Sequence, residues 1–116
     1  MNNINEKRER YMRDSLSVRL GGLAANLARV SSISNNASNL EAALGLMEES
    51  KYFIEWTAGE SQIETATALV DVQRKLAKWQ RTLNADWKID ERRAEIGIEA
   101  KQLSNFVLQR SGLLER

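Results

Sequence analysis

The sequence predicts an all-α protein, and three observations support that fold class. None of the 116 residues is proline, which breaks helix interiors because it lacks an N–H and its ring clashes with the preceding turn. The good helix formers Leu, Ala, Glu, Arg and Lys are plentiful. Apolar residues recur at steps of three and four, the spacing that keeps side chains on one helix face. The length suits a single domain, 1–116.

The first predicted helix spans 5–32. Its apolar face consists of Leu16, Leu20, Leu23, Leu27 and Val30. These positions follow one another at steps of four and three, so they share one side of a helix. The Ser-Asn-Asn run at 34–36 then predicts a turn, because asparagine tolerates the left-handed backbone that ends many helices.

The second and third predicted helices, 39–57 and 61–83, each begin near a capping-box pattern. In this pattern a serine accepts from an N–H of the first turn, and a glutamate three positions later accepts from the serine's own N–H. Two such pairs occur, Ser38 with Glu41 and Ser61 with Glu64. Gly59 lies between the two helices and is expected to take the positive φ that often follows a helix.

The fourth predicted helix spans 87–114, after the apolar phase of the third helix is lost at Leu83. Its stripe consists of Ile89, Ile96, Ala100, Leu103, Val107 and Leu114. Short connections make sequential amphipathic helices antiparallel, so the predicted architecture is a four-helix up-down-up-down bundle. Two alternatives stay open. Dimerisation could complete or extend the bundle, or a three-helix unit could receive the long first or last helix of a second copy.

The residues that the chain lacks limit its chemistry. It contains no His and no Cys, which excludes a Ser-His-Asp triad, a Cys nucleophile and the usual zinc, haem and iron–sulfur ligands. Glu91, Glu95 and Glu99 recur every four residues and would suit a divalent ion or acid–base work. The partner residues of such carboxylate sites are missing. We therefore expect no enzyme, no metal and no cofactor.

The distribution of apolar residues and charge bears on location. No apolar run approaches the roughly 20 residues needed to cross a bilayer, and the charged N-terminus leads into no signal-peptide core. The formal charge of +1 argues against a general nucleic-acid coat. We expect a cytoplasmic protein without membrane contact.

One stretch, 74–93, combines basic and aromatic side chains. Its candidate binding residues are Lys75, Lys78, Arg81, Lys88 and Arg92. Because Trp79 and Trp87 lie among them, the stretch could hold phosphates and stack bases, which predicts an anion or nucleic-acid site as an alternative function. The plainer interpretation is a solvated helix face with Trp79 in the core.

A second set of residues predicts protein contacts. Aromatic and methionine side chains, which are enriched at interfaces, gather where the second helix ends, and two glycines in the first helix permit close approach. The candidate interface residues are Tyr11, Met12, Gly21, Gly22, Tyr52 and Trp56. A core plug and a dimer contact fit the aromatic pattern equally well. The leading hypothesis is a non-enzymatic helical-bundle protein that acts through protein–protein contacts, as a homodimer or as a subunit of an assembly.

Overall fold

A computed structural model describes residues 3–112 of the chain. Within this range the protein is all-α, with no strand, as the composition predicts. The described part of the chain consists of five α-helices and two short 3₁₀ turns: α1 Asn3–Met12, α2 Leu16–Ile33, η1 Ala37–Asn39, α3 Leu40–Thr57, η2 Ala58–Glu60, α4 Ile63–Asp86 and α5 Asp90–Ser111.

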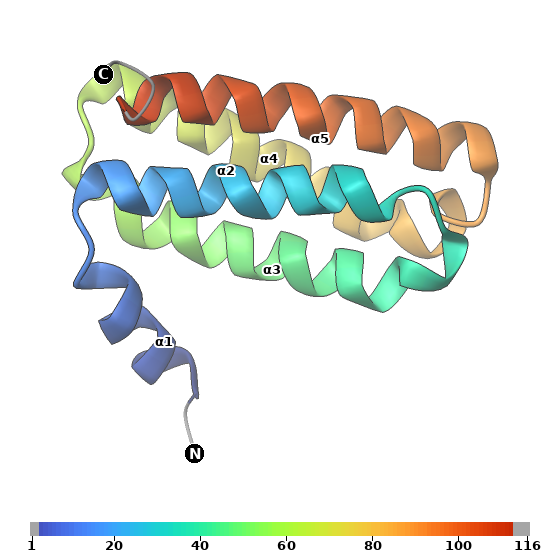
Figure 1. The fold of residues 1–116 in the computed structure, drawn as a ribbon, viewed down its shortest axis with the longest axis horizontal. Helices are drawn as coiled ribbons and strands as arrows, with labels where there is room; N and C mark the ends of the chain where they lie inside the picture. Colours follow the sequence, from blue (N-terminus) through green and yellow to red (C-terminus); the bar gives the residue numbers. More distant parts are fainter. Residues whose placement is uncertain (1–2, 113–116) are drawn as a thin grey trace.

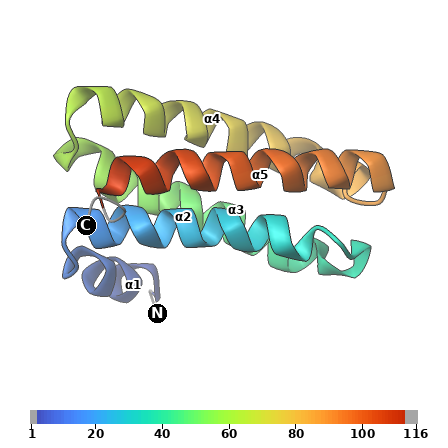
Figure 2. The same cartoon turned by 45° about the horizontal axis from the view of Figure 1, so that its top comes forward.

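The four longer helices pack with bundle-like contacts. Figure 1 shows α2, α3, α4 and α5 side by side, with α1 leaving the group at the end where α2 begins. The contact between α2 and α5 is the most extensive, followed by those of α3 with α2 and with α4, whereas α4 and α5 touch sparsely. Figure 2 shows α5 lying between α4 and α2. The bundle is therefore tightly packed along three helix pairs and loose along the fourth.

The core is made of the apolar stripes read from the sequence. Its largest fully buried side chains are Trp87, Leu23, Leu27, Met47, Ile54, Leu69, Leu76, Leu83, Val30, Val72 and Val107. The apolar spacing of the third predicted helix places Leu69, Val72, Leu76, Trp79 and Leu83 on one face. All five are buried, because a period of 3.6 residues keeps steps of three and four on the inner face. Two members of the fourth stripe differ. Ile89 is 46% exposed, because it precedes α5 in extended backbone instead of lying within the helix, and Leu103 is only half-buried.

The prediction of one continuous first helix over 5–32 was wrong. The chain breaks between α1 and α2, and Ser15 caps the start of α2 by accepting a 3.3 Å hydrogen bond from the amide of Val18. Asp14 and Ser15 are residue types that favour helix starts over helix interiors. The break lets α1 turn back and contact α3.

The two predicted capping boxes do not form. Residues 37–39 make a 3₁₀ turn instead, whose Asn36 side chain accepts from the Ser38 amide, and no side chain caps α3. Gln62 precedes α4 without a side-chain cap, and the Ser61 hydroxyl donates to the Thr57 carbonyl oxygen. The 3₁₀ turns place both serines before the true helix starts, so their hydroxyls bond locally.

The predicted helix ends also need correction. Gly59 lies in the 3₁₀ turn η2, and within residues 3–112 only Gly112, at φ 81°, has a positive φ. The Ser-Asn-Asn turn after α2 likewise uses no left-handed residue. The third helix extends to Asp86 and the fourth begins at Asp90, so Trp87 lies in the connection and not in a helix. The predicted end at Leu114 falls outside the described residues.

Candidate functional site

The predicted aromatic cluster is assembled around Tyr11 of α1. The Tyr11 ring stacks on Phe53 of α3 with centroids 4.0 Å apart and an interplanar angle of 6°. Trp56 lies 5.8 Å from Tyr11 and also stacks on Tyr52, with centroids 5.5 Å apart. Tyr11 is only 8% exposed. The structure therefore brings Tyr11, Tyr52 and Trp56 together within one chain, with α1 covering the cluster; whether a second chain also contacts them stays a prediction.

The hydroxyl of Tyr11 has partners on two elements. It donates to the Arg19 carbonyl oxygen over 2.8 Å and accepts from the Thr57 hydroxyl over 3.3 Å. Burial raises the pKa of Tyr11 to about 12, although the Thr57 hydrogen bond and the nearby Arg19 charge act in the opposite direction. The hydroxyl is thus a neutral group that ties α1 to α2 and α3.

Arg19 supports the same contact and was not singled out from the sequence. Its side chain is 5% exposed, and its guanidinium pairs with Glu60 over 2.7 Å and donates to the Asp14 carbonyl oxygen over 3.1 Å. The guanidinium also lies 3.2 Å from the sulfur of Met12. Met12, a predicted interface residue, therefore contacts Arg19 of the same chain. The hydrogen bond and charge of Arg19 lower the pKa of Glu60.

A second polar contact joins α1 and α2 to α3 through Glu49. Lys7 pairs with one carboxylate oxygen over 2.5 Å, and the Asn26 amide donates to the other over 2.9 Å. Burial by itself would raise the pKa of Glu49, but the hydrogen bonds and positive charges outweigh it, so the pKa is lowered. The contact of α1 with α3 is therefore apolar at Tyr11 and ionic at Glu49.

Close helix approach occurs at a glycine that the sequence reasoning missed. Gly21 and Gly22 are half-buried, and a Cβ on Gly22 would lie 3.8 Å from the Tyr11 ring, an ordinary contact. At Gly97 of α5, a Cβ would lie 2.1 Å from the Ser34 hydroxyl oxygen and 3.0 Å from the Ser34 Cβ. Ser104, further along α5, donates over 2.7 Å to the Ala24 carbonyl oxygen. Small side chains thus bring α5 close to α2.

The predicted basic stretch is only partly brought together. Lys75, Lys78 and Arg92 line one hollow of about 170 Å³ between α4 and α5, whereas Arg81 and Lys88 do not line it. Three carboxylates line the same hollow: Asp86, Glu95 and Glu99. Lys75 pairs with Glu99 over 2.7 Å, and Arg92 lies 3.9 Å from Asp86.

The tryptophans of this stretch lie in the core. Trp87 is fully buried and Trp79 nearly so. The Lys75 ammonium lies 5.9 Å from the centre of the Trp79 ring. Neither indole is presented to solvent, so neither offers the open stacking face that base binding uses. The hollow is therefore a surface of mixed charge.

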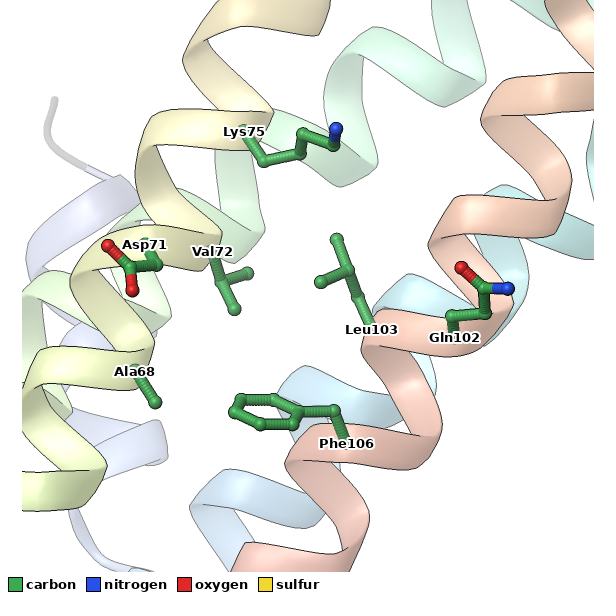
Figure 3. Close-up of a pocket in the computed structure, with 7 residues that line it drawn as sticks. All are labelled: Ala68, Asp71, Val72, Lys75, Gln102, Leu103 and Phe106. Carbon is green, nitrogen blue, oxygen red and sulfur yellow. The ribbon is translucent and has the colours of Figure 1, made fainter.

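An apolar groove continues from this hollow along α4 and α5. It has a volume of about 430 Å³ and is lined by Ala68, Asp71, Val72, Lys75, Gln102, Leu103 and Phe106. Figure 3 shows Val72, Leu103 and Phe106 pointing into the space between the two helices. The Arg110 guanidinium lies over the Phe106 ring, 3.7 Å from its centroid. Lys75 borders both the groove and the hollow, so the two depressions adjoin, and together they are here called the α4–α5 groove.

The groove exists because α4 and α5 are loosely packed. Both helices bury their strongest apolar stripes elsewhere: α4 packs on α3, and α5 packs on α2. Leu103 and Phe106 are left half-buried at the edge of the core. No such concave apolar surface was expected from the sequence, because the stripe of the fourth helix was assigned wholly to the core.

No protein-family model matches the chain, and neither a curated protein nor a solved structure matches it significantly. In the part of the chain from residue 3 to residue 112, no group of three or more carboxylates is placed to hold a metal ion. No helix of that part is both long and apolar enough to cross a membrane.

Proposed function

We propose that the protein is a non-enzymatic helical-bundle protein that acts through protein–protein contacts, and that the α4–α5 groove is the contact surface. The single observation that carries this function is the groove itself, with apolar side chains along its floor and charged side chains along its rims. Grooves of this kind between helices receive the apolar face of another helix. The finer architecture belongs to the same proposal: α2 to α5 form an up-down-up-down bundle that is open along one side.

The chemistry of the chain supports a binding role over a catalytic one. With no His and no Cys, acid–base or nucleophilic catalysis would depend on carboxylates, lysines and hydroxyls. Of the three stacked glutamates, Glu99 is already paired with Lys75. The cytoplasm remains the predicted compartment.

The alternative function is an anion- or nucleic-acid-binding module that uses Lys75, Lys78, Arg81, Lys88 and Arg92. The carboxylates in the hollow weaken this alternative, because they oppose the approach of phosphates. Binding to a labelled oligonucleotide should therefore be weak at low salt. Tight binding that falls steeply with salt, and is lost when Lys75 and Lys78 are replaced by alanine, would favour the alternative.

Site-specific photo-cross-linking in native cells tests the proposed function. A photoreactive amino acid at Gln102, on the rim of the groove, should give discrete protein adducts. The matched control is the same amino acid at Arg29, which is exposed on α2 and does not line the groove. Equal or absent adduct formation at the two positions would contradict a docking role for the groove.

A further inference from the structure

We propose that the occupant of the α4–α5 groove is a second copy of this chain, related to the first by a two-fold axis that runs along the groove. Each α4 then faces the α5 of the other copy. This inference rests on the proposed function and names the partner of the same surface. The evidence for it is the distribution of charge along the two rims.

The rims carry opposite charges at corresponding levels. At the middle of the groove, the α4 rim presents Lys75 and Lys78. The α5 rim presents Glu95 and Glu99 at that level, as the 2.7 Å pair between Lys75 and Glu99 shows. Near the connection between the helices the signs are reversed, with Asp86 on α4 opposite Arg92 on α5. Opposite charges therefore face each other across the groove at both levels.

This pattern is self-complementary about a two-fold axis that runs along the groove. A two-fold axis along the groove exchanges the rims and preserves the level, so Lys75 and Lys78 of each copy meet Glu95 and Glu99 of the other. An axis across the groove would set α4 against α4 and, when centred at the level of Lys75 and Lys78, would bring these two lysines of both copies together. Like charges in close apposition oppose association. The charges thus favour a second copy whose two-fold axis runs along the groove.

The apolar part of the groove fits the same arrangement. Leu103 and Phe106 of α5 are half-buried beside Val72, and the α4 rim is low here because Ala68 is small. In the two-fold arrangement the α5 side chains of each copy lie against the α4 rim of the other. An isologous contact uses this one surface twice, so both copies have their grooves covered.

A charge-swap experiment tests the inference. One variant carries Lys75→Glu and Lys78→Glu, and the other carries Glu95→Lys and Glu99→Lys. We expect sedimentation equilibrium to show a concentration-dependent dimer for the natural chain and, for each variant alone, a dimer dissociation constant raised by at least about tenfold. Mixing the two variants should restore association, because the acidic rims of one then face the basic rims of the other.

The matched control carries Arg81→Glu and Lys88→Glu. It makes the same change in net charge as the first variant, in the same part of the chain, at positions that do not line the groove. It should associate like the natural chain. Circular dichroism melting confirms that each variant is helical before its association is measured.

Cross-linking provides a second readout that leaves the charged rims of the hollow intact. The chain contains no cysteine, so single substitutions Asp71→Cys and Gln102→Cys give one thiol each, on opposite rims of the groove. A short bismaleimide should join the mixture of these two variants more efficiently than either variant alone.

Three results would overturn the inference: a natural chain that stays monomeric at high concentration, a dimer that is insensitive to the groove charges, and charge-swapped variants that do not associate when mixed. None of these purified-protein results bears on whether adducts form at Gln102 in cells. The proposed function can therefore survive the loss of the two-copy model, and its own failure would appear in that separate experiment.

Discussion

Two regions of the molecule combine apolar rings with basic side chains, and they differ in whether a helix of the chain covers them. At the contact of α1 with α3, Tyr11 stacks on Phe53 and its hydroxyl is fully engaged. At the α4–α5 groove, Phe106 is half-buried, with the Arg110 guanidinium over its ring. The first region is closed by the chain's own helix, and the second is open.

The difference follows from how each pair of helices is connected. The break at residues 13–15 frees α1 to turn back onto α3 and fill the space beside Phe53. The short connection at 87–89 holds α4 and α5 together at one end, but each packs on a different neighbour along its length. Within residues 3–112 no segment remains to fill the gap between them. An aromatic and basic pattern therefore indicates a binding surface only when no local helix covers it.

The largest expected effect comes from removing an aromatic ring from each region. Tyr11→Ala should destabilise the protein by about 3–4 kcal/mol, because it empties a buried, hydrogen-bonded position. Phe106→Ala should cost about 1 kcal/mol, because the ring is only half-buried. Urea denaturation followed by tryptophan fluorescence measures both. Equal losses would mean that the two regions are equally packed.

The dependence of stability on alkaline pH distinguishes the two regions, because it reports the protonation of the Tyr11 hydroxyl. The folded pKa of Tyr11 is about 12, whereas an unfolded tyrosine titrates near 10, so the unfolded state loses its proton first as the pH rises. The stabilisation that the neutral Tyr11 hydroxyl contributes is fully present below about pH 10 and is lost as the pH rises towards 12, a change of up to about 3 kcal/mol. Tyr11→Phe should remove this part of the pH dependence, and Phe106→Ala should retain it. A Tyr11→Phe profile parallel to that of the natural chain would contradict a buried neutral hydroxyl.

A pair of glycine substitutions tests whether α5 packs tightly against α2. Gly97→Ala should destabilise by about 1–2 kcal/mol, because its Cβ meets Ser34 at the α2 contact. Gly45→Ala, in α3 with nothing within 4 Å of the added Cβ, should instead stabilise by up to about 1 kcal/mol. Thermal melting measures the difference. The same sign for both changes would contradict a tight α2–α5 contact.

The smallest effect is expected from partly filling the groove. Ala68→Leu adds a larger side chain at the edge of open space, so the stability of the monomer should change by less than about 0.5 kcal/mol. Chemical denaturation at low protein concentration checks this tolerance. A loss comparable to that of Gly97→Ala would show that the groove is already closed.

Much of the fold could be predicted because it depends on local periodicity. The stripes through Leu23, Leu27 and Leu76 are buried because side chains three and four residues apart lie on the same side of a helix. The absence of proline, the abundance of helix formers and this spacing together predicted the all-α class.

The features that the sequence did not predict depend on contacts between distant segments. The apolar spacing continues past the break at Arg13–Ser15, so only the Asp14-Ser15 pair, a common helix-start sequence, could have signalled it. Gly97 matters because Ser34 lies beside it, 63 positions earlier in the chain. The groove depends on which helices α4 and α5 pack against. In each case the packing of helices decides the outcome.

Amide hydrogen exchange at low and high protein concentration compares the two regions most directly. If the α4–α5 groove is the docking surface and a second copy fills it, protection should increase with concentration in 68–78 and 95–106. Protection in 3–12 and 49–57 should stay constant, since α1 already covers that contact. Concentration-dependent protection confined to 3–12 and 49–57, or absent throughout, would contradict the assignment of the groove as the surface through which this chain binds its own copy.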